Sequence, residues 1–478
     1  MRGRFGRVVG LAFPALLSSF VFLLWAGPAE SSGCILDDPG CDWGVVWTRS
    51  YTSSGMLYDA ATGVAVDTEG NAWVVGQVEG NKWAIKKYSP AGTLLWSETL
   101  AAYYAAKSVA IDSQGNVVVV GRTSAPGTSS RWVIRKYDSS GVLKYDAFYQ
   151  GALGADDFTT GVAIDSGNNI IVCGREQYGA DQAEWVVRKY NPILNNTWSR
   201  SYSFGDGYDT PYGVAVDGSG NIFVAGDVRV SDHYEWTARK YDPSGNFLWN
   251  DRPFRGTAQG IAAMPGGEVV VTGQKIISSI AFWQTIRYGS SNATPTEIWS
   301  CEFNQPILGG VPIRGGIGQG VVKMKDCDDI AVVGYKDIGT GTNQDWYILR
   351  YSGAGNLLAY QSFNGPASLN DQALSVSVDP TNGDILVAGW ETDTAGNGGV
   401  NWVVRRLRES YLAVSVTSSP ANVAPGQAFS IIATVTNKSY GTCVLLCYSP
   451  GIGQGRAALV PRHCGNPVIS FISDRVAC

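Results

Sequence analysis

Four aspartates recur at one position of this chain, each four residues before a short, alternating apolar segment. They are Asp59, Asp157, Asp209 and Asp371, and three of them have an aromatic neighbour, namely Tyr58, Tyr208 and Phe158. Carboxylate oxygens accept hydrogen bonds from sugar hydroxyls or hold a cation, while a ring face stacks on a sugar. Two facing carboxylates can also carry out glycoside hydrolysis. We therefore take these seven residues as the candidate ligand-binding set, expected to ring one mouth of a channel.

A structural role competes with this interpretation. An aspartate that precedes a strand often accepts hydrogen bonds from the backbone of its own loop. The other three copies of the pattern carry Tyr104, Gly256 and Gly316 at this position, so the acid is not repeated in every copy. We therefore favour loop capping over ligand binding, and ligand binding over catalysis.

Other catalytic and metal-binding signatures are missing from the sequence. The two histidines, His233 and His463, lie far apart in the chain and assemble no Ser-His-Asp set. The chain has no P-loop, and no dinucleotide fingerprint sits between a strand and a helix. The late cysteines have a spacing that does not match a zinc module. We expect neither a cofactor nor a metal, and a binding role more than an enzymatic one.

A repeated unit must position the aspartates. Its clearest copy reads GVAVDTEGNAWVVG, then KWAIKKYSPAG, then TLLWSETL, and copies recur every 45 to 60 residues. Each copy predicts four short strands. The first has alternating apolar residues, the second is apolar, the third reads W-x-x-x-basic-Y and the fourth carries an aromatic. A D-x-x-G-N hairpin turn joins the first strand to the second. Four strands per repeat of this length predict a β-propeller blade. The seven copies begin at Gly63, Ser108, Gly161, Gly213, Gly260, Gly320 and Ser375.

The two ends of the repeat region complement each other. The seventh copy ends near Leu407 without its fourth strand, and residues 45–51 (VVWTRSY) precede the first copy and match the fourth-strand pattern. Pairing them would leave no exposed sheet edge. We therefore predict an all-β, seven-bladed propeller over 44–410 in which residues 45–51 pair with the third strand of the last blade, near 401–407.

The pattern resembles a known family. The motif G-[VI]-A-x-D-x-x-G-N-x-x-V-x-G followed by W-x-x-[KR]-Y-x-x-x-G is similar to the SBBP-type propeller repeats of exported bacterial and archaeal proteins, over the whole of 44–410. The resemblance implies the propeller fold and export, and it carries no catalytic residues. Copies five and six depart from it, because Met264 and Met324 replace the turn aspartate.

Two residues of the third strand are nearly constant. We expect the Trp of each copy to pack between blades, because one aromatic at a fixed strand position is typical of core packing. The basic residue four positions later persists where the turn aspartate is lost, so that aspartate cannot be its only partner. We favour a structural pair or a solvated edge over a basic ring that binds anions. The basic residues are Lys87, Lys136, Lys189, Lys240, Arg287, Arg350 and Arg406.

The N-terminus predicts export. Residues 1–29 combine a basic start, an apolar run and small residues near Pro28, the pattern of a secretory signal peptide. Residues 30–43 form a cysteine-containing linker, in which we predict a Cys34–Cys41 disulfide. Small residues before Cys34 also resemble a lipoprotein site, which leaves a lipid anchor there as an alternative. The expected location is secreted or at the cell surface, and no membrane span is expected.

Residues 411–478 change character, and their alternating strands and cysteines are similar to the opening of an immunoglobulin-like adhesion or spacer module. About 100 residues are needed for that fold, so the segment would be truncated or stapled by cysteines. The formal net charge of −5 argues against a nucleic-acid partner. We therefore predict a monomeric, exported, non-catalytic binding or scaffold propeller whose long loops present a face to a protein or glycan. The alternative is an exported polysaccharide hydrolase or lyase that uses carboxylates at the channel mouth.

Overall fold

The computed structural model describes residues 43–53, 58–101, 103–123, 129–151, 153, 156–179, 182–204, 207–303, 315–337, 344–392, 399–409, 412–419, 430–437 and 441–448. The predicted signal peptide and the predicted Cys34–Cys41 disulfide lie outside these residues. Within the described part of the chain, no helix is long and apolar enough to cross a membrane.

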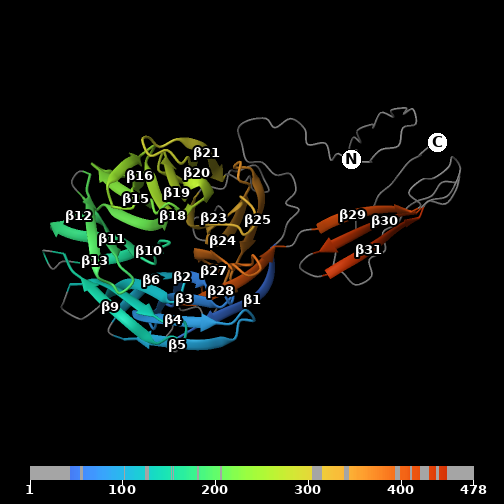
Figure 1. The fold of residues 1–478 in the computed structure, drawn as a ribbon, viewed down its shortest axis with the longest axis horizontal. Coiled ribbons are helices and arrows are strands. Elements are labelled where there is room, and N and C mark those ends of the chain that lie inside the picture. The colour runs from blue at the N-terminus through green and yellow to red at the C-terminus, as the bar shows by residue number, and fades with distance from the viewer. Residues whose placement is uncertain are drawn as a thin grey trace. The chain divides into compact units, whose positions relative to one another are not determined.

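Seven four-stranded antiparallel sheets follow one another around a common axis (Figure 1). The first three blades are β2 (Ala60–Val66), β3 (Ala72–Val78), β4 (Lys82–Tyr88) and β5 (Leu94–Leu100); β6 (Tyr103–Ile111), β7 (Val117–Thr123), β8 (Trp132–Tyr137) and β9 (Leu143–Tyr149); and β10 (Phe158–Ile164), β11 (Ile170–Gly179), β12 (Gln182–Tyr190) and β13 (Asn196–Tyr202).

The next three blades have the same order of strands. They are β14 (Thr210–Val216), β15 (Ile222–Val230), β16 (His233–Tyr241) and β17 (Phe247–Asp251); β18 (Gly256–Ala263), the 3-10 turn η1 (Pro265–Gly267), β19 (Val269–Ile277), β20 (Ile280–Tyr288) and β21 (Glu297–Phe303); and β22 (Gly316–Lys323), β23 (Ile330–Asp337), β24 (Gln344–Tyr351) and β25 (Leu357–Phe363). The all-β, seven-bladed propeller predicted from the sequence is confirmed.

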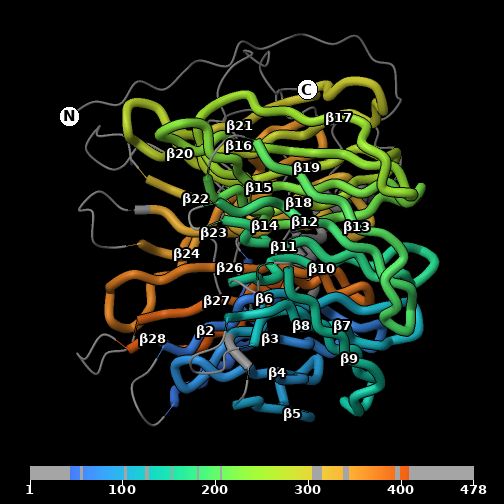
Figure 2. The backbone as a smooth tube through the Cα atoms, turned by 90° about the vertical axis from the view of Figure 1, so that its left-hand side faces the viewer, coloured from blue at the N-terminus to red at the C-terminus, as the bar shows by residue number. Residues whose placement is uncertain are grey.

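The seventh blade joins the two ends of the repeat region. It is formed by β26 (Asp371–Val378), β27 (Ile385–Thr392), β28 (Val400–Glu409) and β1 (Trp43–Tyr51), with β1 on its outer edge. The predicted closure is confirmed: β1 runs antiparallel to β28, with Val45 opposite Leu407 and Tyr51 opposite Trp402. Figure 2 shows this blade between the strands of blade 6 and those of blade 1.

The first strand of each blade is the innermost and contacts the first strand of the next blade, and β26 contacts β2 to complete the ring. Each of these strands contains a bulge, where one extra residue interrupts the pairing with the second strand. Bulges re-aim a side chain and often lie next to binding sites. Strand β6 has two bulged residues, Ala105 and Lys107. In the other six strands the bulged residues are Thr62, Thr160, Tyr212, Gln259, Gln319 and Leu374.

The third-strand Trp of every blade fits against a glycine in the second strand of the next blade. All seven Trp side chains are at most 1% exposed, which confirms the packing predicted from the sequence. A Cβ atom on any of these glycines would lie only 2.6–2.9 Å from the indole. The contact therefore requires glycine, because any side chain at this position would collide with the indole. The pairs are Trp83 with Gly121, Trp132 with Gly174, Trp185 with Gly226, Trp236 with Gly273, Trp283 with Gly334, Trp346 with Gly389 and Trp402 with Gly76.

The constant basic residue of the third strand ties its blade to the next one. Lys136 Nζ lies 2.8 Å from Asp112 Oδ2 in its own blade, and it donates to the carbonyl of Pro192 in the following blade at 3.0 Å. Lys189 repeats both contacts with Asp165 and with Pro243. These residues are structural pairs, as favoured from the sequence.

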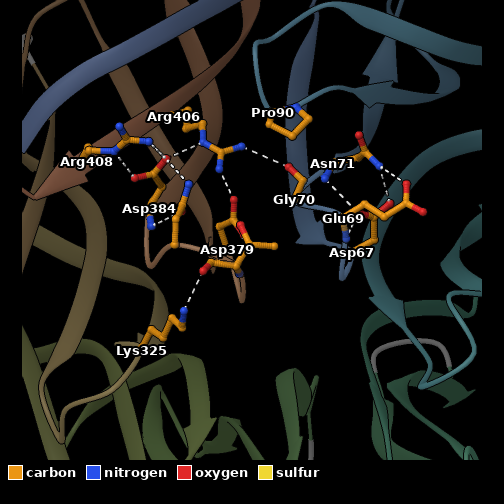
Figure 3. A network of polar contacts seen from close by, with 12 residues as sticks. Asp67, Glu69, Gly70, Asn71, Pro90, Lys325, Asp379, Asp384, Arg406 and Arg408 are labelled. Atoms are coloured by element: carbon orange, nitrogen blue, oxygen red, sulfur yellow. Dashed lines mark hydrogen bonds and ion pairs between the residues drawn. The ribbon is translucent and has the colours of Figure 1, made fainter. Parts of the chain in front are cut away.

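Arg406 makes the same connection at the ring closure (Figure 3). Its guanidinium pairs with Asp379 and with Asp384, and its Nη1 donates to the carbonyl of Gly70 in blade 1 at 3.1 Å. Arg408 binds the other oxygen of Asp384 at 2.7 Å. Burial pushes the pKa of Asp384 up, but the hydrogen bonds from the two guanidinium groups outweigh it and lower that pKa.

Blades 5 and 6 keep this pair although they lack the turn aspartate. In these two blades the acid follows the hairpin turn instead of preceding it. Glu268 pairs with Arg287, and Asp329 pairs with Arg350. Met264 and Met324 are instead 3% exposed and pack in the core. The basic residue persists in these two copies because it still has a carboxylate partner.

Strands β29 (Leu412–Ser419), β30 (Ser430–Asn437) and β31 (Gly441–Tyr448) form a separate three-stranded antiparallel sheet. An immunoglobulin-like module in this segment stays a prediction.

Candidate functional site

The four candidate aspartates hold loops rather than face a channel. Each is at most 1% exposed. Asp157 Oδ2 accepts the backbone N–H of Gly151 at 2.6 Å, and its Oδ1 accepts that of Gln177 at 2.9 Å. One carboxylate thus joins the loop that enters the first strand to the end of the second strand.

The other three aspartates repeat this geometry. Asp59 accepts from the backbone of Ser53 and Glu79, Asp209 from Phe204 and Arg229, and Asp371 from Gly365 and Thr392. The structure therefore does not have the expected ring of carboxylates around a channel mouth. Both oxygens of each acid point into the protein, where they accept hydrogen bonds from backbone N–H groups. Burial raises the pKa of Asp157 and Asp209, and it raises that of Asp371 to about 6.

The three aromatic neighbours lie at the surface beside these loops. Tyr58 is 45% exposed, and its ring lies 6.1 Å from that of Trp390. Phe158 and Tyr208 are half-buried on the adjacent blades 3 and 4. The structure thus separates Tyr58 from the other two and gives these two a set of partners that the sequence analysis did not name.

Phe158 and Tyr208 belong to an alternating stack of rings and guanidinium groups. Arg122 of blade 2 lies 5.5 Å from the centre of the Phe158 ring, and Arg175 of blade 3 lies 4.4 Å from it. The Arg175 guanidinium also lies 4.7 Å from the centre of the Tyr208 ring in blade 4. Cation–π contacts of this kind hold a guanidinium in place and leave its N–H edge available for hydrogen bonds.

Two bulged residues of the inner strands extend this cluster toward the axis. Lys107 of β6 has a lowered pKa because it is buried and close to Arg122. Tyr212 of β14 hydrogen-bonds to the carboxylate of Asp227, which lies in the same blade. Asp227 is 2% exposed, and burial raises its pKa to about 7. We call these residues the blade 2–4 cluster: Lys107, Arg122, Phe158, Arg175, Tyr208, Tyr212 and Asp227.

Sequence reasoning missed most of this cluster, although a signal was present. Arg122, Arg175 and Asp227 each come directly after the glycine that receives the Trp of the preceding blade. The flanking positions are nearly constant, but this one varies from blade to blade. Variation at one position of a constant repeat indicates a residue that the fold itself does not require. The seven residues are Gln77, Arg122, Arg175, Asp227, Gln274, Tyr335 and Trp390.

Comparison with known proteins agrees with the fold. Residues 197–227 match the family SBBP, described as Beta-propeller repeat. The chain carries an SBBP propeller repeat. The matched SBBP segment covers the last strand of blade 3 and most of the first two strands of blade 4. The turn aspartate and the strand glycines that define the SBBP pattern are the structural residues described above, whereas the cluster occupies positions that the pattern leaves open.

The other comparisons are more distant. No curated protein matches the chain. One similar solved structure is a gluconolactonase from Xanthomonas campestris, which is 14% identical, with a TM-score of 0.35 over 61% of this chain and 82% of that one. A likeness at that level says nothing about the activity of this chain.

The loop aspartates give the first prediction. We expect Asp157→Asn and Asp209→Asn each to lower the free energy of unfolding by about 1–2 kcal/mol, because each leaves one buried backbone N–H without its acceptor. The two effects should add in the double variant, since the sites lie in different blades. Thermal melts with and without calcium measure this, and Asp146→Asn, which changes an exposed acid, is the control. Neutral single variants, or a calcium-dependent shift that the double variant abolishes, would contradict loop capping.

Asp227 gives a prediction about pH. Its pKa is raised to about 7 in the folded protein, so the folded state keeps a proton that the unfolded chain releases near pH 4. Stability should therefore fall as the pH rises from about 4 to 7. We expect Asp227→Asn to match the wild type near pH 4 and to become progressively more stable than the wild type as the pH rises to 7. Denaturant unfolding across this range tests it, and a difference that does not change with pH would refute it.

Proposed function

We propose that this protein is an exported, non-catalytic binding propeller that holds a glycan or protein ligand on the face of blades 2–4. The single observation that carries the proposal is the stack of Arg122, Phe158, Arg175 and Tyr208. Three consecutive blades supply these side chains from positions that the repeat does not need for folding. The signal peptide predicted for residues 1–29 supports export.

Binding is favoured over catalysis by the state of the carboxylates. The four acids on which the enzymatic alternative relied are buried and hydrogen-bonded to backbone. Rigid side chains on a rigid scaffold suit recognition, because little entropy is lost when the ligand binds.

The experiment is a ligand screen on the full-length chain. A glycan array and a panel of surface proteins are probed with the wild type, with the Arg122→Gln/Arg175→Gln double variant and with Lys144→Gln. Lys144 is an exposed cation on the outer strand β9 and serves as the charge-matched control. We expect a ligand that the wild type and the control bind and that the double variant binds at least tenfold more weakly. A ligand held equally by all three would place the binding face elsewhere.

A polysaccharide hydrolase or lyase is the second candidate, favoured by one observation. Asp227 has a pKa near neutrality beside the Tyr212 hydroxyl, as a general acid or base requires. The array ligands are therefore also incubated with the protein, and new reducing ends or unsaturated sugar ends are measured. Turnover that Asp227→Asn abolishes, with binding retained, would establish the enzyme instead.

A further inference from the structure

The blade 2–4 cluster contains more positive charge than its surroundings neutralise. Lys107, Arg122 and Arg175 follow one another across two blades, and neither Lys107 nor Arg175 forms an ion pair with any described residue. Both side chains are half-buried. Removing a cation even partly from water without a partner costs free energy, and a protein usually avoids this by supplying a carboxylate. Two such cations in one place indicate that an anion from outside the chain completes the site.

The guanidinium of Arg175 is held by two aromatic rings. Its central carbon lies 4.4 Å from the centre of the Phe158 ring and 4.7 Å from that of the Tyr208 ring. Its Nε atom is buried and has no hydrogen-bond partner among the described residues. A guanidinium edge binds a planar carboxylate with two parallel hydrogen bonds, which a rounder anion matches less well.

The same cluster also contains a hydrogen-bond acceptor, the carboxyl group of Asp227. A site that binds only a simple anion would not place a carboxylate beside it, because like charges repel. Asp227 lies close enough to Arg175 for the two charges to interact, and its Oδ1 is buried with no hydrogen-bond partner in the described structure. The Tyr212 hydroxyl and the Thr210 backbone N–H donate to this carboxyl group. An unsatisfied oxygen beside unpaired cations fits a ligand that carries hydroxyl donors next to its carboxylate.

Resting on the function proposed above, we propose that the blade 2–4 cluster binds a glycan containing uronic acid. Arg175 holds the sugar carboxylate, Arg122 and Lys107 add positive charge beside it, and Asp227 accepts a hydrogen bond from a ring hydroxyl. Asp156, an exposed acid near Arg175, is already engaged by the backbone N–H and hydroxyl of Ser130. Asp156 forms no ion pair with Arg175 among the described residues, so the guanidinium of Arg175 stays available to the ligand.

Titration calorimetry with a matched pair of ligands tests the inference. The probes are an oligogalacturonate and its methyl ester, which differ only in the carboxylate charge, and poly-glutamate represents an acidic peptide. We expect the wild type to bind the oligogalacturonate at least tenfold more tightly than the ester, with an affinity that falls as salt is added. Tight binding of the ester, or equally tight binding of poly-glutamate, would overturn the proposal.

Point variants assign the individual contacts. Arg175→Gln and Lys107→Met should each weaken binding of the oligogalacturonate at least tenfold while binding of the ester stays unchanged, and Lys144→Gln should leave both unchanged. Asp227→Asn should weaken the oligogalacturonate and the ester alike, because both retain the ring hydroxyls. Thermal melts of each variant identify any that fails to fold, and Arg175→Lys then replaces Arg175→Gln, since it keeps the charge and removes the paired hydrogen bonds. Unchanged affinity in folded Arg175 and Lys107 variants would refute the site.

The two proposals fail in different ways. If the ligand screen finds a neutral glycan or a protein that depends on Arg122 and Arg175, the binding function holds and the uronic acid assignment is wrong. If the oligogalacturonate binds with full affinity to the Arg122→Gln/Arg175→Gln double variant, the proposed binding face itself is wrong.

Discussion

We expect removal of residues 1–52 to open the propeller and to lower the free energy of unfolding by about 5 kcal/mol or more. The estimate follows from the loss of the buried side chains of Trp43 and Trp47, since deleting one buried Trp costs about 3–5 kcal/mol. Strand β1 is the outer edge of blade 7, and it also donates to blade 1 through Trp47 and Arg49, whose side chains bond to the carbonyls of Pro90 and Gly92. Its loss exposes the edge of β28 and separates the last blade from the first.

A chain that lacks residues 1–42 is the matched control, because it keeps all of β1. Chemical denaturation and gel filtration compare the two truncations with the full-length protein. A synthetic peptide of residues 43–53 should restore stability to the shorter chain by adding a strand to the open edge, whereas a scrambled peptide should not. Equal stability of the two truncations would show that β1 does not close the ring.

Gly226→Ala has the second largest expected effect, a loss of about 3 kcal/mol of unfolding free energy. The added Cβ atom would lie 2.2 Å from the carbonyl oxygen of Thr210 and 2.7 Å from Trp185 in the preceding blade. Neither neighbour can withdraw, because the carbonyl belongs to the inner strand and the indole is fully buried with its Nε1 bonded to the Asp227 carbonyl at 2.8 Å. The two blades must therefore separate.

Gly218→Ala is the control, because Gly218 lies in the hairpin that joins β14 to β15, the strand that contains Gly226. No atom lies within 4 Å of a Cβ at that position, so the same substitution should change stability by less than about 0.5 kcal/mol. Tryptophan fluorescence during denaturation follows both the unfolding and the environment of Trp185. A Gly226→Ala protein as stable as the Gly218→Ala protein would show that the blades tolerate a side chain at this contact.

The architecture could be predicted because it depends on features that repeat in the sequence. One Trp and one basic residue at fixed positions recur in all seven copies, and the count of strands required the first strand to complete the last blade. The structure adds the reason for the constant glycine of the second strand, which receives a Trp from the neighbouring blade. That partner lies at least 37 residues away along the chain, in another repeat, so the spacing within one repeat could not reveal it.

The candidate site was predicted only in part, for a physical reason. The sequence alone selected Phe158 and Tyr208, because an aromatic beside an aspartate is visible locally, and it selected Asp157 and Asp209 for the same reason. Whether those carboxylates face solvent or backbone N–H groups depends on loops that fold back from the preceding blade, which the sequence does not show. The guanidinium stack likewise requires three blades to stand side by side, since Arg122, Arg175 and Tyr208 come from three separate repeats. The sequence by itself thus determined the blades and their order, whereas only the tertiary structure decided which side chains meet at their surface.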